Sequence, residues 1–144
     1  MLKGLFIVLL FFTSTISAQI EWNKFEDDSI KTGNKNFIIL YFTADWCNWC
    51  RQLNLKTFSE ESVIKTMNEY FYSVKINESN KYDLHTINEQ HLSGKEFAYL
   101  IGVNSFPTII ITDKNLVKLK KINGYIKPEE FEVLLNILRK NEYN

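Results

Sequence analysis

Residues 37–50 read Phe-Ile-Ile-Leu-Tyr-Phe-Thr-Ala-Asp-Trp-Cys-Asn-Trp-Cys, and this stretch contains both cysteines of the chain, Cys47 and Cys50. The segment 36–42 has the pattern of a strand that is covered on both faces. The cysteines follow it at Cys-x-x-Cys spacing, and we expect a helix to begin at Cys47. A strand that delivers two thiols to the start of a helix is the arrangement that reversible thiol–disulfide exchange needs.

Residues 1–18 have the features of a cleaved export signal. Lys3 provides a positive charge, residues 5–12 are apolar, and the small residues that end at Ala18 offer a cleavage site. An apolar run this short cannot cross a bilayer as a helix. The alternative for this segment is a buried N-terminal helix. We predict a mature domain over 19–144 that is exported, periplasmic or secreted, and that has no membrane span after signal cleavage.

The composition excludes some classes of partner. The chain carries 17 basic and 17 acidic residues, so its formal net charge is zero. This balance indicates neither nucleic acid nor a membrane surface as a partner. The length fits one domain with its own core, and we expect a monomer. A bridge between Cys47 and Cys50 would close too short a loop to stabilise the fold much, which leaves the cysteines for another role.

The first half of the chain alternates helix and strand. Apolar residues recur at helical spacing over 21–32, which predicts an amphipathic first helix. After the strand and the Cys47 helix, Ser59 is placed to cap a second helical stretch that continues to Tyr70. A further strand follows at 71–76. Strand, helix and strand at this length predict a right-handed parallel βαβ unit.

The second half predicts an antiparallel hairpin and a closing helix. Residues 77–94 are polar and rich in turn signals, and an alternation over 82–86 favours a short strand among them. The remaining pattern predicts a brief helix that ends at Gly102, two strands around a tight turn, and a last helix that begins at Pro128. The two strands fall at residues 107–112 and 116–122. The whole order predicts an α/β fold with a mixed sheet flanked by helices on both faces.

Three of these features together resemble the thioredoxin superfamily. They are the Trp-Cys-x-x-Cys of residues 46–50 after an apolar strand, the Phe-Pro-Thr of residues 106–108, and Gly124 before the last helix. Residues 45–59 are most similar to exported members such as the C-terminal domain of the DsbD thiol:disulfide interchange family. The resemblance covers essentially the whole mature chain. It implies a thioredoxin-like fold and an enzyme, a thiol–disulfide oxidoreductase.

The resemblance also implies roles for individual residues. Cys47 would be the exposed nucleophile and Cys50 the buried resolving thiol, and their redox-active disulfide would serve without any other cofactor. The bond before Pro107 would be cis, a form that is rare in folded chains. Phe106, Pro107 and Thr108 would line a substrate groove beside the cysteines.

The chemistry at Cys47 follows from its expected place at a helix start. Free backbone N–H groups and the helix dipole favour an anion there, so the pKa of the thiol should lie below its usual value of about 8.5. The Cys47 thiolate attacks a substrate disulfide and forms a mixed disulfide. Cys50 then attacks Cys47 and releases the reduced substrate, and the reverse sequence oxidises a dithiol.

Several positions depart from the family pattern. Asn48 and Trp49 separate the cysteines, and the absence of an imidazole there argues against a strongly oxidising enzyme. Tyr41 occupies the position where thioredoxins bury an aspartate, and a phenol with a pKa near 10 is a poor base for Cys50. Lys75 on the neighbouring strand is a candidate to assist instead. The alternative for Lys75 is an ordinary strand lysine that reaches solvent.

Two other roles for the cysteines are open to the sequence. Cys47 and Cys50 could form a purely structural disulfide. They could also join His85 and His91 in a zinc site, but the separation from Cys50 to His85 is much longer than zinc-finger spacing. We therefore expect no metal and interpret both histidines as solvated loop residues.

The aromatic and proline residues near the cysteines also have alternatives. We predict that Trp46 and Trp49 contact substrate, although aromatic residues at a strand end also serve as core packing. Pro107 could simply begin an edge strand. The Phe-Pro-Thr match favours the cis groove.

Two functional hypotheses result. The first is an exported thiol–disulfide oxidoreductase whose partners are protein thiols and disulfides and an upstream redox protein. The second is a non-enzymatic thioredoxin-like module that binds a partner through its Phe106-Pro107 groove and keeps a structural Cys-x-x-Cys bridge. A redox titration separates the two.

Overall fold

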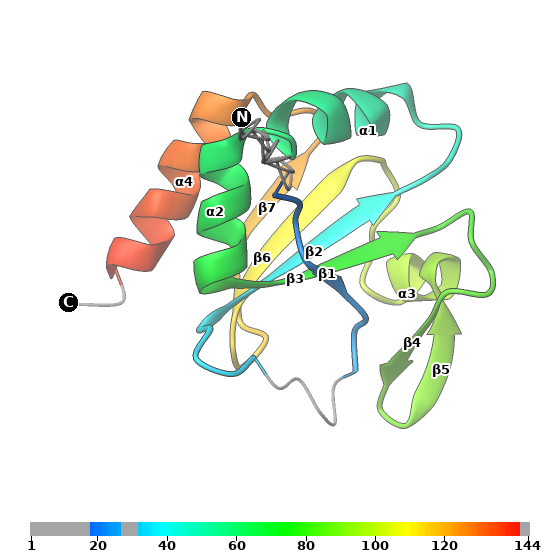
Figure 1. Cartoon of the computed structure of the whole chain (residues 1–144). Coiled ribbons are helices and arrows are strands. Elements are labelled where there is room, and N and C mark those ends of the chain that lie inside the picture. The colour runs from blue at the N-terminus through cyan, green and yellow to red at the C-terminus, as the bar shows by residue number, and fades with distance from the viewer. Residues whose placement is uncertain (1–17, 27–31, 142–144) are drawn as a thin grey trace, which may run out of the picture.

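The computed structural model describes residues 18–26 and 32–141, which form one central sheet with helices on both sides (Figure 1). The sheet has five strands in the order β1-β3-β2-β6-β7. β1, β2 and β3 run parallel, and β6 and β7 continue the sheet antiparallel. The strands are β1 (Trp22–Asn23), β2 (Phe37–Thr43), β3 (Phe71–Asn77), β6 (Thr108–Asp113) and β7 (Lys118–Asn123). The predicted mixed α/β sheet is confirmed.

Helices and a separate hairpin cover the two faces of the sheet (Figure 1). Side chains of η2, α2 and α4 pack with the sheet in one buried cluster, and side chains of α3 pack with it in another. The hairpin of β4 and β5 lies beside α3. These elements are α1 (Asn48–Gln52), the π-helical segment η2 (Leu53–Thr57), α2 (Glu61–Tyr70), β4 (Leu84–Ile87), β5 (Gln90–Ser93), α3 (Gly94–Leu100) and α4 (Pro128–Asn141).

β2 is the centre of the core, and all seven of its residues are buried. Successive side chains of a strand point to opposite faces. Ile39 and Tyr41 therefore join the cluster under α2 and α4, whereas Ile38 and Leu40 join the cluster under α3. This confirms the predicted strand with two covered faces, and burial of these side chains is a main source of stability.

The predicted helix over 21–32 is wrong for residues 21–26, and residues 27–31 lie outside the described part of the chain. Trp22 and Asn23 instead form β1 along the edge of β3. The Trp22 ring packs 5.6 Å from Tyr41 and 5.4 Å from Phe58. Pairing with an open sheet edge and partial burial of Trp22 outweigh the local helical spacing, and neither is visible in the segment itself.

The predicted cap at Ser59 is also wrong. The helix that begins after Cys47 continues through η2, and the Ser59 hydroxyl donates back to the carbonyl of Leu55 at 2.6 Å. Ser59 thus ends one helix, and α2 begins two residues later with Glu60 at its N-cap position. A serine hydroxyl can satisfy a free carbonyl as well as a free N–H, and local sequence does not decide between them.

The segment between β3 and β6 contains the expected short strand and brief helix, with one correction. β4 covers part of the predicted alternation, β5 pairs with it, and a capping box of Ser93 and Glu96 begins α3. His85 on β4 is fully buried, so its interpretation as a solvated residue is wrong, whereas His91 is exposed.

Over residues 18–26 and 32–141, no helix combines the length and apolar character needed to cross a membrane.

Candidate active site

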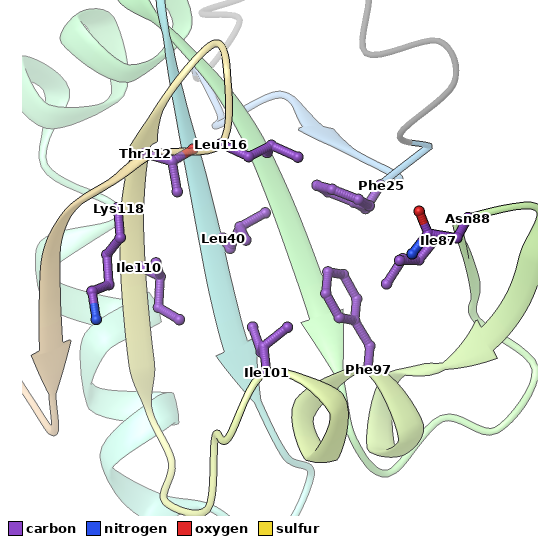
Figure 2. Close-up of a pocket in the computed structure, with 10 residues that line it drawn as sticks. All are labelled: Phe25, Leu40, Ile87, Asn88, Phe97, Ile101, Ile110, Thr112, Leu116 and Lys118. Carbon is purple, nitrogen blue, oxygen red and sulfur yellow. The ribbon is translucent and has the colours of Figure 1, made fainter.

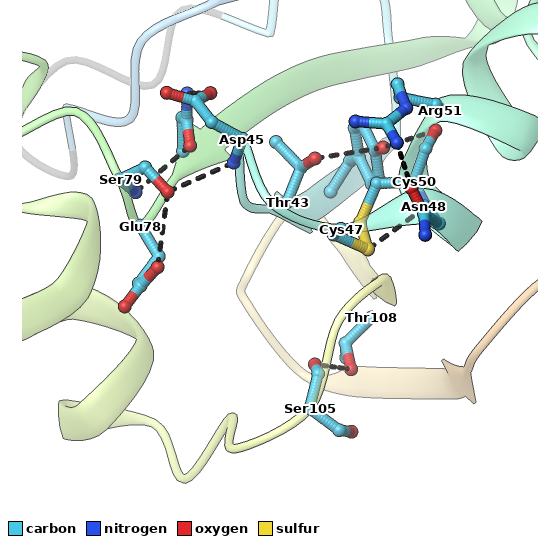
Figure 3. The surroundings of a disulfide bond; sticks show 12 residues. Thr43, Asp45, Cys47, Asn48, Cys50, Arg51, Glu78, Ser79, Ser105 and Thr108 are labelled. Atoms are coloured by element: carbon cyan, nitrogen blue, oxygen red, sulfur yellow. Dashed lines mark hydrogen bonds between the residues drawn. A yellow bond between two sulfur atoms is a disulfide. The ribbon is translucent and has the colours of Figure 1, made fainter.

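Cys47 and Cys50 form a disulfide at the start of α1, with their Cα atoms 5.2 Å apart (Figure 3). β2 ends at Thr43, and the chain turns through a hydrogen bond from the Cys47 N–H to the Ala44 carbonyl. Cys47 is the N-cap of α1, and its Sγ accepts the Cys50 N–H at 3.0 Å. A free helix N–H directed at this sulfur is the environment that stabilises a thiolate.

The two cysteines differ little in exposure. Cys50 is 1% exposed and Cys47 is 4% exposed, so the expectation that Cys47 is exposed is wrong for this disulfide form. Phe106, on the loop before β6, packs against the buried cluster of Ala44, Cys47 and Cys50. Access to Cys47 therefore depends on the aromatic side chains around it.

The loop before β6 faces the disulfide (Figure 3). Its Phe106–Pro107 peptide bond is cis, and the Pro107 carbonyl accepts the Gly124 N–H at 2.8 Å. Thr108 is fully buried, and its hydroxyl donates to the Ser105 carbonyl at 2.8 Å. The Thr108 side chain therefore holds the loop together and does not line a groove.

Two tryptophans frame the disulfide on the outside. Trp46 is 67% exposed and Trp49 is 62% exposed, so the core-packing alternative is wrong for both. The Trp46 ring stands edge-on to Phe106 at 5.9 Å, and the Trp49 ring lies 6.1 Å from Tyr125. Sequence reasoning missed Tyr125. Its position directly after Gly124 was the available signal, because that glycine was already part of the family pattern.

A polar network fixes the loop that carries Trp46. The Asp45 carboxylate accepts a hydrogen bond from the side-chain amide of Asn77 at 2.8 Å. The Asp45 N–H donates to the Ser79 hydroxyl at 3.0 Å (Figure 3). Asn77 ends β3, which lies next to β2 in the sheet. Sequence reasoning also missed Asn77 and Ser79, because only the parallel pairing of β2 and β3 brings them to Asp45.

Tyr41 lies on the core side of the disulfide. Its hydroxyl is 3.2 Å from the Thr43 hydroxyl and 3.4 Å from the Cys50 carbonyl oxygen. Burial raises the pKa of Tyr41 above its ordinary value. The phenol therefore stays protonated at neutral pH, and it can donate a hydrogen bond but cannot take the Cys50 proton.

Lys75 pairs with Tyr41 in the β2–β3 register. It is half-buried and, with Trp22 and Asn54, lines a cavity of about 420 Å³ on the same side of the sheet. The structure thus places Lys75 next to Tyr41 at a solvent-accessible cavity.

The four residues of the zinc alternative do not converge. Cys47 and Cys50 are bonded to each other, whereas the His85 Nδ1 accepts the N–H of Phe25 at 3.2 Å. Over the described ranges 18–26 and 32–141, no three metal-ligating side chains come together.

Comparison with known proteins identifies relatives of this arrangement. A family model described as a thioredoxin-like domain matches residues 26–138. The chain is 36% identical over 111 residues to the thiol:disulfide interchange protein DsbD of Campylobacter jejuni. That match covers 75% of this chain but only 17% of the relative. The predicted resemblance to DsbD is thereby confirmed for one segment of that longer protein.

Solved structures share the fold. A thioredoxin-fold protein from Helicobacter pylori superposes with a TM-score of 0.67 at 23% identity, covering 76% of this chain and 73% of the other. The reduced C-terminal domain of DsbD from Neisseria meningitidis gives a TM-score of 0.55 at 16% identity, covering 77% and 88%. The sheet order, the Cys-x-x-Cys at the start of α1 and the family match agree, and the chain belongs to the thioredoxin-like family.

Proposed function

We propose that this protein is an exported thiol–disulfide oxidoreductase that reduces or exchanges protein disulfides through Cys47 and Cys50. The observation that carries the proposal is the Cys47 sulfur, which caps α1 and accepts the Cys50 N–H within a thioredoxin-like fold. An N–H that already points at this sulfur favours its ionised form when the disulfide is open.

The reaction follows from the two sulfurs. In the reduced protein the Cys47 thiolate attacks one sulfur of a substrate disulfide, a mixed disulfide forms, and the other substrate sulfur leaves as a thiolate. Cys50 loses its proton and attacks Cys47, which restores the intramolecular disulfide and releases the substrate with two thiols. Two electrons pass from the protein to the substrate. Because Tyr41 is no base, the Cys50 proton goes to water or to the departing substrate thiolate.

The surroundings of Cys47 favour a polypeptide substrate. Trp46, Trp49, Phe106 and Tyr125 surround the disulfide with aromatic surface, and both tryptophans are exposed. Aromatic side chains give much contact area at little cost in conformational entropy, as binding surfaces require. The loop that carries the cis Phe106–Pro107 bond lies beside them.

Export is part of the same proposal. Residues 1–18 have the order of charge, apolar core and small residues of a signal peptide. Disulfide chemistry is common in the periplasm and outside the cell, where an upstream redox protein must supply or remove electrons. The protein would work there as a monomer without a further cofactor.

Insulin reduction coupled to dithiothreitol tests the activity. Cys47→Ser should abolish the reaction, and Cys50→Ser should accumulate the mixed disulfide because the resolving thiol is absent. Val133→Ser, on an exposed position of α4, is the control and should retain full activity. Full activity of Cys47→Ser would refute the proposal.

The low exposure of Cys47 keeps a second function open, a binding module with a structural bridge. A redox titration distinguishes the two. An exchange enzyme should equilibrate with glutathione or dithiothreitol between about −270 and −120 mV, the range that known thiol–disulfide proteins cover. A structural bridge would stay oxidised throughout that range.

A further inference from the structure

The sheet carries a cavity of about 340 Å³ on the face that α3 covers, lined by none of the residues around the disulfide (Figure 2). Leu40 of β2 and Ile110 of β6 form its floor, and Phe25, Phe97 and Ile101 form one side. Leu116, in the turn between β6 and β7, approaches from another side (Figure 2). Seven of the ten lining residues are apolar, and the polar ones are Asn88, Thr112 and Lys118.

The described residues cover this face only in part, and the cavity lies where their cover ends. Residues 21–26 do not form the expected helix, and α3 ends at Leu100. Leu40 is 5% exposed and Ile110 is 7% exposed, whereas Ile39 and Ile111, the next residues along the same strands, are fully buried against the opposite layer. Leu40 and Ile110 are thus buried, and they line the floor of the cavity.

The turn that carries Leu116 presents an apolar side chain at the mouth of this cavity. Leu116 has a φ of 64°, in the left-handed region, which is unfavourable for a leucine and suits glycine or asparagine. The Asp113 carboxylate holds the turn by accepting the N–H groups of Asn115 at 2.9 Å and Val117 at 2.8 Å. Strained backbone that holds a particular side chain in place is typical of ligand contacts.

Charge determines which ligand fits. Lys118 is the only ionisable side chain among the described residues that line the cavity. Lys118 pairs with Thr112 and Lys121 pairs with Ile110, so both lysines lie on the face of the sheet that holds the cavity. Lys120 pairs with Ile111 and lies on the opposite face. An apolar slot with cations along one edge complements an apolar chain that ends in an anion.

We propose that this cavity binds an anionic amphiphile, a small molecule whose apolar chain ends in a carboxylate. The chain would lie against Leu40, Phe97 and Ile110, with the carboxylate near Lys118. The volume lies within the range of small-molecule sites, which begins at about 300 Å³. This site does not depend on the thiol chemistry at Cys47.

Calorimetric titration of the purified protein with decanoate tests the proposal. Decanoate should bind saturably at one site. Decyltrimethylammonium has an alkyl chain of nearly the same length with the opposite charge, and it should bind about tenfold more weakly or worse, because the lysines repel it.

Two variants with matched controls locate the ligand. Lys118→Met should weaken decanoate binding about tenfold by removing the cation, whereas Lys120→Met, on the opposite face, should leave it unchanged. Ile101→Trp should abolish binding by filling the mouth, whereas Tyr99→Trp, at an exposed residue outside the lining, should not. Circular dichroism of each variant establishes that it is folded.

Three results would overturn the proposal. Decanoate could show no saturable binding, the two amphiphiles could bind equally, or Ile101→Trp could bind decanoate like the unchanged protein. The last result would place the amphiphile elsewhere, for instance on the exposed tryptophans near Cys47. Insulin reduction by Ile101→Trp should remain normal, so failure here and failure of the proposed exchange activity are separate observations.

Discussion

Tyr41 is the polar side chain whose hydroxyl reaches the backbone of Cys50, at 3.4 Å from its carbonyl oxygen. Since burial raises the pKa of Tyr41, the phenol is neutral and takes no proton during exchange. Tyr41→Phe should therefore leave the rate of insulin reduction within about twofold of the unchanged protein. It should lower the free energy of unfolding by about 1 kcal/mol through the lost hydrogen bond. Urea unfolding measures the second effect.

Tyr72→Phe is the matched control for this change. The Tyr72 hydroxyl donates to the Lys24 carbonyl at 3.2 Å, so the variant also loses one tyrosine hydrogen bond, but at a distance from the disulfide. A large loss of activity with an altered pH profile in Tyr41→Phe alone would show that the hydroxyl does take part in proton transfer.

His85 makes stability depend on pH. It is fully buried, its Nδ1 accepts the Phe25 N–H, and its Nε2 finds no hydrogen-bond partner among the described residues. Burial lowers the pKa of His85, a shift that Lys24 increases and Asp83, 3.7 Å away, opposes. The folded state therefore keeps His85 neutral at a pH where the unfolded chain, with a pKa near 6.5, already binds a proton.

The direction in which stability changes with pH follows from this difference in bound protons. Stability is unaffected well above pH 6.5, falls as the pH drops below about 6.5, and levels off once the pH is below the folded-state pKa. Urea midpoints measured from pH 8 to pH 5 should show this loss. His85→Asn retains an acceptor for Phe25 and should flatten the curve, whereas His91→Asn at an exposed position should not. Equal slopes for all three proteins would contradict the assignment.

At the scale of elements, Gly94, the first residue of α3, lies closely against Asn77 at the end of β3. A Cβ at this position would collide with the backbone carbonyl of Asn77. Gly94→Ala should therefore destabilise the protein by about 1–3 kcal/mol, as overpacking does. Because the Asn77 side chain holds Asp45, the variant should also loosen the loop that carries Trp46. Thermal unfolding and insulin reduction measure the two effects.

Lys95→Ala provides the comparison for Gly94→Ala. Lys95 is the next residue of α3 and is exposed, so its substitution should change stability by no more than about 0.5 kcal/mol. If Gly94→Ala were as stable as Lys95→Ala, the close approach of α3 to Asn77 would be excluded.

At the scale of the whole molecule, α4 closes the core over one face of the sheet. Phe131 is fully buried and packs edge-on against Phe58 at 5.9 Å. Phe131→Ala should lower the free energy of unfolding by about 3–5 kcal/mol, because it removes buried surface and leaves a cavity. Val133→Ala on the exposed side of the same helix should cost about 0.5 kcal/mol or less. Urea unfolding of both variants measures the difference, and similar midpoints would contradict this packing.

The sequence was sufficient for features that repeat within a short segment. Local patterns predicted several features correctly. These are the apolar run of β2, the helical spacing of α2 and α4, and the close spacing of Cys47 and Cys50. The helix predicted from local spacing was wrong at residues 21–26, because Trp22 and Asn23 pair with the open edge of β3 as a strand. The predicted helix cap at Ser59 was wrong for a similar reason. Its hydroxyl donates to a carbonyl at the end of η2 and does not accept an N–H group at the start of α2.

The sequence by itself determined that a dithiol follows a buried strand and opens a helix, since both depend on residues close together in the chain. Only the tertiary structure decided the burial of His85, the position of Tyr125 next to Trp49, and the cavity above Leu40. Each of these depends on side chains that approach one another from distant segments. Such contacts are set by how sheet and helices pack together, and no local pattern records them.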